Sequence, residues 1–105
     1  MIVDLRIYTI KAGRMADFVA CYQEFGWATQ SRILGDCVGW YTTIEGELNT
    51  VVHMWGYASQ ADRETRRAAM AADPNWKIYV GKTAEMGLLV RMENRILSPA
   101  SFSPK

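Results

Sequence analysis

The first apolar positions of the chain alternate with polar ones. Residues 2–11 divide into two faces, with Val3, Leu5 and Ile7 on one and Asp4, Arg6 and Tyr8 on the other. This period of two predicts a β-strand. After Gly13 the apolar residues recur at steps of three and four, which predicts an amphipathic helix from Arg14 to about Ile33, with Gly35 as its stop.

Two further strand-like runs follow, at 37–44 and 49–57, separated by Glu45-Gly46-Glu47-Leu48. This spacing predicts a hairpin in which Gly46 takes a positive φ. With Gly46 and Glu47 as a two-residue loop, antiparallel counting pairs Trp40 with His53, Thr42 with Val51 and Val38 with Trp55. A slip of one residue would place Cys37, Gly39 and Tyr41 on that face instead, so the assignment depends on register.

The second half of the chain predicts two helices and a strand. Ser59 followed three residues later by Asp62 is a variant of the capping box, and it opens a helix with small residues along one side. Asp73-Pro74 ends that helix and starts another, because proline excludes helical geometry from the residue before it and fits the first turn of a new helix. Gly87 ends the second helix, and residues 88–96 return to strand character. Residues 98–105 are predicted to be an irregular tail.

The element order β-α-β-β-α-β over residues 1–97 predicts an α+β, ferredoxin-like domain, an antiparallel sheet with both helices on one face. We assign the aliphatic set to the helix side: Val3, Leu5, Ile7, Val52, Met54, Val90 and Met92. The opposite, open face then carries Asp4, Arg6, Tyr8, Trp40, Val51, His53, Trp55, Arg91, Glu93 and Arg95. Such a face is too apolar to stay in water, which predicts a twofold homodimer with a small cleft between its two sheets.

Composition narrows the functional classes. The chain has 105 residues, with 12 Lys and Arg against 11 Asp and Glu, so it lacks the basic surface of a nucleic-acid or membrane-surface binder. It has two cysteines without C-x-x-C spacing and one histidine, which supports neither a disulfide framework nor a zinc site. Charged residues near the N-terminus argue against a signal peptide, and no apolar run is long enough to cross a membrane. We expect a cytoplasmic protein.

Candidate chemistry centres on His53 and Tyr8, which we name as candidate catalytic residues because each has a proton to give near other polar groups. A structural histidine between two tryptophans is the competing interpretation of His53. The candidate substrate-binding residues are Arg6, Trp40, Trp55, Arg91 and Glu93. The arginines suit an anionic group, although cross-strand ion pairs with acidic neighbours explain them equally well. No metal site is predicted.

Four segments together resemble the NIPSNAP family. They are M-I-V-D-L-R-I-Y-T-I-K-A-G at the start, G-W-Y-T-T-I-E-G-E-L-N-T-V-V-H-M-W-G-Y in the hairpin, S-Q-A-D-R-E-T-R-R-A-A-M-A-A-D-P-N-W after it, and E-N-R-I-L-S-P near the end. The most specific part runs from the Leu48-Asn49 pair through His53-x-Trp55 to Asp62-Arg63 and Asp73-Pro74-x-Trp76. The resemblance covers nearly the whole chain.

The resemblance implies a dimeric α+β barrel, an architecture shared with cofactor-independent monooxygenases, haem-degrading monooxygenases and muconolactone-isomerase-like enzymes. Three functional hypotheses follow. The first is a homodimer that binds a small organic molecule, either as a ligand or as the substrate of a cofactor-free oxygenase or isomerase in which His53 or Tyr8 moves a proton. The second is a non-catalytic scaffold dimer whose interface is filled by tryptophans. The third is haem binding through His53; otherwise no cofactor is expected.

Overall fold

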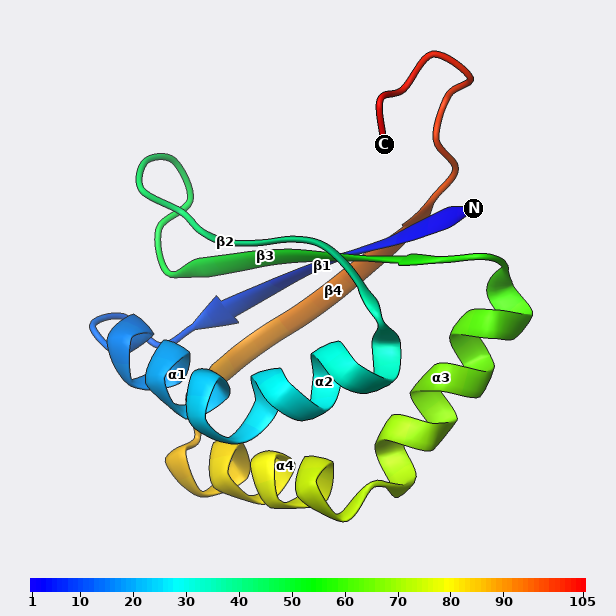
Figure 1. Ribbon diagram of the computed structural model, residues 1–105. Coiled ribbons are helices and arrows are strands. Elements are labelled where there is room, and N and C mark those ends of the chain that lie inside the picture. Colours follow the sequence, from blue (N-terminus) through cyan, green and yellow to red (C-terminus); the bar gives the residue numbers. More distant parts are fainter.

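The first strand, β1 (Ile2–Ile10), lies in the middle of a four-stranded antiparallel sheet of order β2-β3-β1-β4. Its neighbours are β3 (Thr50–Tyr57) and β4 (Leu89–Leu97), and β2 (Asp36–Thr42) forms the edge beyond β3. The computed structural model describes all 105 residues, and Figure 1 shows the helices on one side of the sheet. This confirms the predicted α+β, ferredoxin-like arrangement. None of the helices combines the length and apolar character that crossing a bilayer requires.

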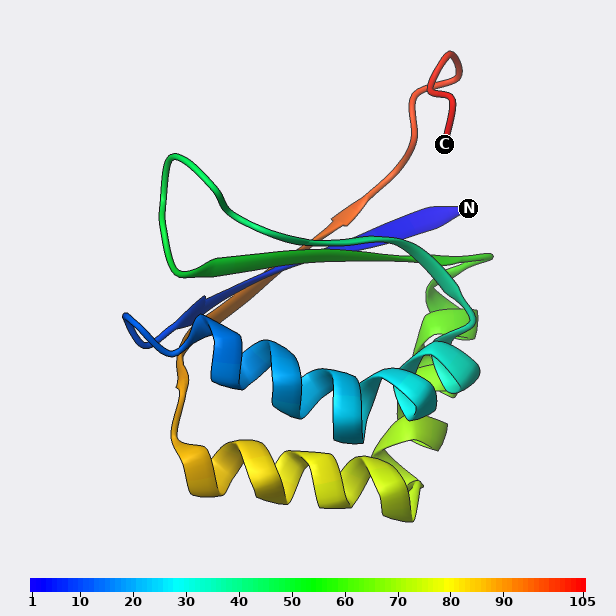
Figure 2. The same ribbon diagram turned by 60° about the vertical axis from the view of Figure 1, so that its left-hand side comes forward.

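The helical segment after β1 has the predicted extent but is less regular than its pattern predicts. It consists of α1 (Met15–Cys21), a π-helical segment η1 (Tyr22–Gly26) and α2 (Trp27–Leu34), which Figure 2 shows as one rod beneath the sheet. It ends at Gly35, whose φ of 86° confirms the predicted stop. The π segment was not predicted. Such segments occur often at functional sites, because the extra residue redirects the side chains around it.

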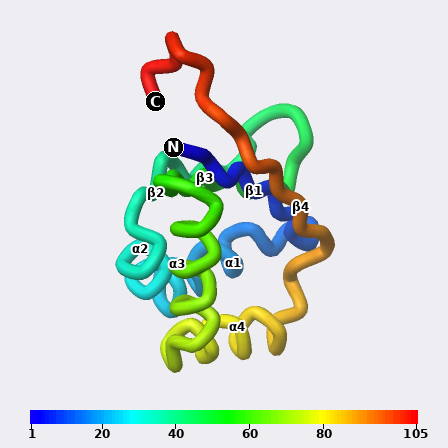
Figure 3. The backbone as a smooth tube through the Cα atoms, turned by 90° about the vertical axis from the view of Figure 1, so that its right-hand side faces the viewer, coloured from blue at the N-terminus to red at the C-terminus, as the bar shows by residue number.

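The other two helices start and stop where the sequence predicts. In α3 (Gln60–Ala72), the Ser59 side chain accepts a hydrogen bond from the Asp62 backbone nitrogen at 3.1 Å. In α4 (Pro74–Met86), Asp73 plays the same part, and Gly87 ends the helix in the left-handed conformation at φ 60°. Figures 2 and 3 show that α4 lies below the α1–α2 rod and away from the sheet. α4 thus forms a second helical tier, farther from the strands than the α1–α2 rod.

The assignment of faces was wrong for β1 and β3. The helices cover the face that carries Asp4, His53 and Trp55, which are at most 2% exposed, whereas Leu5 and Met54 lie on the uncovered face. We call these the inner face and the outer face. Directly opposite residues in an antiparallel pair share a face, so the register fixes both sets. The inner face comprises Ile2, Asp4, Arg6, Tyr8, Ile10, Val51, His53, Trp55 and Tyr57.

The edge strands complete the two faces. Trp40 pairs with His53, and Thr42 with Val51, as predicted, which places Trp40 on the inner face with His53. Cys37 rather than Val38 pairs with Trp55, because a bulge separates Cys37 from Gly39. On β4 the alternation was predicted correctly, since the charged residues pair with outer-face residues of β1: Arg91 with Thr9, Glu93 with Ile7, and Arg95 with Leu5.

The core has three clusters, of which Cys21, Tyr22 and Tyr79 form one between helical segments, and the other two lie at the ends of the inner face. Ile10, Phe18, Val51 and Leu88 form one, near the turn from β1 into α1. Leu34, Trp55, Tyr57 and Met70 form the other, beneath α2 and α3. Between the clusters, the inner face carries polar side chains instead of aliphatic ones. The middle of the inner face is therefore the candidate functional site.

Candidate functional site

A chamber of about 210 Å³ lies between the inner face and the helices. Every strand and helix of the fold contributes to its wall. The lining residues are Arg6, Tyr8, Phe18, Tyr22, Gln30, Trp40, His53, Arg67, Trp76, Tyr79, Val80, Thr83, Leu89 and Met92. The space equals that of about seven liquid water molecules, enough for one ring with its substituents. Two lining side chains are cationic and none is anionic.

His53 is the best defined polar group of the chamber. Its Nδ1 accepts a hydrogen bond from Trp55 Nε1 at 2.8 Å, so the ring proton sits on Nε2. Burial, together with the charges of Arg6 and Arg67, lowers the pKa of His53 to about 3 against the opposite effect of Asp4. The imidazole is therefore neutral near pH 7, and its Nε2 presents a hydrogen-bond donor.

Three buried donors around the chamber have no hydrogen-bond partner. They are His53 Nε2, Trp40 Nε1 and Arg67 Nη1. A buried polar group without a partner costs about 1–3 kcal/mol, and more when it is charged. Most buried donors in folded proteins have a hydrogen-bond partner. Three unpaired donors at one chamber therefore mark a candidate position for a hydrogen-bond acceptor.

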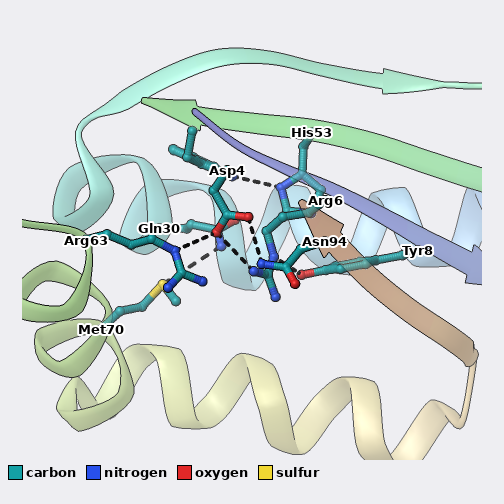
Figure 4. A network of polar contacts seen from close by, with 9 residues as sticks. Asp4, Arg6, Tyr8, Gln30, His53, Arg63, Met70 and Asn94 are labelled. Atoms are coloured by element: carbon teal, nitrogen blue, oxygen red, sulfur yellow. Dashed lines mark hydrogen bonds and ion pairs between the residues drawn. The ribbon is translucent and has the colours of Figure 1, made fainter. Parts of the chain in front are cut away.

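A buried ion cluster holds the chamber's Arg6 in place. Asp4 is fully buried, and its Oδ2 accepts from Arg6 Nη1 at 3.1 Å and from Arg63 Nε at 3.0 Å. Asn94 Nδ2 donates to Asp4 Oδ1 at 3.0 Å, which ties β4 and α3 to β1 (Figure 4). Burial raises the pKa of the Asp4 carboxyl, but the Asn94 hydrogen bond and the charges of Arg6 and Arg63 outweigh it, so the pKa lies below its usual range.

Arg6 connects this cluster to Tyr8. Its Nε donates to the Tyr8 hydroxyl at 3.0 Å, and the Tyr8 ring meets the His53 ring edge-on at 4.8 Å between centroids. The hydroxyl oxygen of Tyr8 thus accepts from a cation, while its own proton stays available to a ligand. Figure 4 shows Arg6 between Asp4 and Tyr8, with His53 on the neighbouring strand.

Aromatic rings form the wall beside Trp40. Its ring stacks on Tyr22 at 5.0 Å, and Tyr22 belongs to the π segment. The Tyr22 hydroxyl donates a hydrogen bond to Oε1 of Gln30, which lies in α2. Gly26 makes room for this arrangement, since a Cβ there would lie 2.8 Å from Tyr22 Cδ2 and 3.1 Å from Tyr79 Cδ1. The π segment therefore aims the Tyr22 ring at the chamber.

The predicted site residues divide between the two faces. Arg6, Tyr8, Trp40 and His53 line one chamber, as their shared face requires. Trp55 is on the same face but fully buried under α2 and α3, where it holds His53 rather than a ligand. The structure does not place Arg91 and Glu93 in this group: they lie on the outer face as an exposed pair with 3.4 Å between Arg91 Nη2 and Glu93 Oε2.

Several residues that line the chamber were not predicted from the sequence. Arg67 was not proposed as a site residue, yet its Nη1 is buried and the residue lines the chamber. Gln30 and Tyr22 were not proposed at all. One signal was present in the sequence: the aromatic residues of β3 that lie at every second position from His53 share its face of the strand. Large aromatic side chains favour burial, so this is the face that the helices cover. The inward arginine of α3 had no comparable signal.

Other places in the molecule offer less. A more open hollow of about 340 Å³ lies near Leu34, Gly56 and Tyr57, but its one arginine already has a partner, with Arg66 Nε 2.9 Å from Asp62 Oδ1. No group of three or more His, Cys, Asp and Glu side chains is arranged to hold a metal ion. The chamber beneath the sheet is the stronger candidate.

Solved structures with similar sequences share this architecture over their whole length. A NIPSNAP family protein from Agrobacterium tumefaciens is 43% identical with a TM-score of 0.93, and 98% of this chain covers 96% of that one. An uncharacterized NIPSNAP-like domain protein from Burkholderia xenovorans is 44% identical with a TM-score of 0.92, covering 99% and 89%. An antibiotic biosynthesis monooxygenase is 12% identical with a TM-score of 0.63, covering 95% and 99%, which is a likeness of fold.

Curated relatives are longer proteins. Protein NipSnap homolog of Dictyostelium discoideum is 32% identical over 99 residues, which are 94% of this chain and 43% of the relative. Protein NipSnap homolog 1 of Danio rerio is 32% identical over 108 residues, 98% of this chain and 36% of the relative. The chain thus spans about two fifths of their length. The NIPSNAP family profile matches residues 3–104. With this match over nearly its whole length, the chain belongs to the NIPSNAP family.

Proposed function

We propose that this protein binds a small organic molecule of one ring in the chamber between the inner face and the helices. The observation that carries the proposal is the set of buried donors without partners, above all His53 Nε2 and Trp40 Nε1. Small-molecule sites are concave, largely apolar and equipped with a few convergent polar groups, and nine of the fourteen lining residues are hydrophobic. The site thus lies within one protomer, and not in the cleft between two sheets that the sequence suggested.

Within this site, His53 acts as a hydrogen-bond donor rather than as an acid–base group. A pKa of about 3 leaves it neutral and weakly basic at pH 7, and the Trp55 hydrogen bond occupies Nδ1. A neutral imidazole N–H of this kind stabilises negative charge that develops on a ligand oxygen. This supports the enzyme alternative, a cofactor-independent oxygenase or isomerase, in the form where His53 polarises a carbonyl or enolate oxygen and Tyr8 supplies or accepts the proton.

The chamber also bears on the other two hypotheses. The scaffold hypothesis fills the interface between two subunits with tryptophans, whereas Trp40 and Trp55 lie on the inner face, within one protomer. Haem binding needs a site at or above the roughly 300–1,000 Å³ of pockets for drug-sized ligands, so a chamber of about 210 Å³ does not fit a haem beside His53. We therefore derive no step that involves haem.

We propose that a second copy of the chain covers the outer face in a homodimer. On the two central strands this outer face is aliphatic, with Leu5, Ile7, Val52 and Met54 side by side. The edge strand β4 flanks these residues with Arg91, Glu93 and Arg95. A standard interface buries about 800 Å² on each partner, and alternating charges at its rim suit a self-complementary twofold contact.

The binding proposal is tested with phenol, benzamide and benzoate as one-ring probes, followed by saturation-transfer NMR. Val80→Trp puts a large side chain into the chamber from α4, and Ile78→Trp is its matched control on the same helix, outside the chamber wall. We expect the wild-type protein and Ile78→Trp to bind at least one probe and Val80→Trp to lose it. Absence of binding of all three probes to the wild-type protein would overturn the proposal.

A further inference from the structure

The side chains that line the chamber carry a net positive charge. Arg6 and Arg67 line it, and no Asp or Glu does. Arg6 is partly neutralised, since its Nη1 donates to Asp4, but that carboxylate also serves Arg63 and so is shared between two cations. Arg67 has no ion pair at all among the salt bridges of the molecule, and its Nη1 is buried without a hydrogen-bond partner.

An unpaired guanidinium nitrogen out of contact with water is costly unless an anion meets it. The surroundings of Arg67 contain no such group from the chain itself. The Tyr57 hydroxyl lies next to Arg67 outside the chamber wall, and as a neutral group it leaves the charge of Arg67 uncompensated. The two neutral donors His53 Nε2 and Trp40 Nε1 complete the set. These unpaired groups present donors and a positive charge, which is the complement of a carboxylate or an enolate.

The rest of the wall is apolar. Phe18, Tyr79, Val80 and Met92 face the same space, and the Trp40 and Tyr22 rings stack beside it. An inorganic anion would leave these surfaces against water, whereas an organic anion covers them with its own hydrocarbon part. The volume of the chamber also favours an organic anion, because room for about seven water molecules is more than a single inorganic oxyanion needs.

We infer that the ligand of the chamber is an organic monoanion, a carboxylate or enolate on an apolar one-ring body, with its charge bound by Arg67 and its oxygen aligned by His53 Nε2. The inference rests on the proposed function, since it names the class of molecule that the same site takes. Arg6 supports the charge from the Asp4 cluster, and Arg67 is the residue that selects an anion over a neutral compound of the same shape.

The test compares benzoate with benzamide, its neutral counterpart of the same shape, and with inorganic phosphate, by isothermal titration calorimetry. We expect benzoate to bind at least about tenfold more tightly than either, because one charge-assisted hydrogen bond is worth that factor or more. Arg67→Gln removes the charge and keeps a donor. It should weaken benzoate at least about tenfold and leave benzamide within about twofold. Arg14→Gln is the matched control, since Arg14 pairs with Asp17 at the surface.

The outcomes separate the two claims. Equal binding of benzoate and benzamide, or an unchanged benzoate affinity in Arg67→Gln, would overturn the anion inference and leave the binding site standing. If phosphate bound as tightly as benzoate, the claim that the anion carries an apolar one-ring body would be overturned. If none of the one-ring probes binds, the proposed function fails and the inference fails with it. Should Arg67→Gln not fold, Arg67→Lys serves in its place: it keeps the charge and loses the second nitrogen, so benzoate should weaken while its preference over benzamide persists.

Discussion

The two faces of the sheet reverse the usual distribution of polar and apolar residues. The inner face, covered by helices, holds an aspartate, an arginine and a histidine, and the uncovered outer face holds Leu5 and Met54. A sheet that only had to fold would bury the aliphatic side. This difference is the basis of both proposals, in which a ligand occupies the inner face and a second copy of the chain covers the outer face.

The buried Asp4 carboxylate tests the inner face most strongly. Asp4→Asn keeps the shape but leaves Arg6 and Arg63 without their counter-charge, and breaking a buried ion cluster in this way costs about 3–5 kcal/mol. Glu93→Gln is the outer-face control, where an exposed pair should change the free energy of unfolding by less than about 0.5 kcal/mol. Urea denaturation measures both. Similar small losses in the two variants would remove the distinction between the faces.

A charge on the outer face should act on assembly and not on folding. Leu5→Glu places a carboxylate opposite Arg95 on β4, a pairing that the isolated protomer tolerates. In the proposed dimer it buries two carboxylates, which should weaken association at least about 100-fold. Sedimentation velocity of Leu5→Glu and of the control Ile78→Glu, on α4 away from the outer face, measures this. A Leu5→Glu protein that stays dimeric would show that the outer face is not the interface.

The neutrality of His53 predicts a stability that depends on pH. Because its folded-state pKa is lowered to about 3 from 6.5, the unfolded chain takes up the proton first as the pH falls. The stabilisation is complete above pH 6.5 and is lost progressively towards pH 3. Between pH 7 and pH 5 the free energy of unfolding should fall by about 2 kcal/mol. His53 is the only histidine, so His53→Gln should abolish this slope. A slope unchanged in the variant would contradict a buried neutral imidazole.

Two tryptophans of the inner face separate structural donors from donors kept for a ligand. Trp55 Nε1 is bonded to His53, and Trp40 Nε1 has no partner. Trp55→Phe should therefore lower the free energy of unfolding by about 1–2 kcal/mol more than Trp40→Phe, because only the former leaves an acceptor unsatisfied. Thermal unfolding of the free protein gives the comparison. Losses in the reverse order would indicate that Trp40 has a structural partner.

Local signals of the sequence predicted the fold well. The helix starts at Ser59 and Asp73 and the stops at Gly35 and Gly87 were predicted because capping depends on a few adjacent residues. The pairing of Trp40 with His53 was predicted correctly, although the connection between β2 and β3, residues 43–49, is longer than the two-residue loop from which the register was counted. The π segment at Tyr22 and the bulge after Cys37 insert residues that no periodic pattern announces.

The site was predicted only in part, for a physical reason. Alternation shows which residues of a strand share a face, so Arg6, Tyr8 and His53 were grouped correctly, but it does not show which face the helices cover. β1 and β3 carry large apolar residues on both faces, and the aliphatic one was chosen wrongly as the buried one. Arg67 was missed because the chamber wall combines residues of all the strands and helices, which is a property of the whole fold and not of the pattern of α3. Figure 3 shows how the helices lie beneath the sheet.

A crystal structure of the protein grown with benzoate tests the contrast between the two faces most directly. We expect benzoate between the inner face and the helices, with its carboxylate within hydrogen-bond distance of Arg67 Nη1 and His53 Nε2, and a second copy of the chain on the outer face over Leu5 and Met54. Benzoate held between two outer faces, with the inner chamber free of it, would show that the ligand site is not on the inner face.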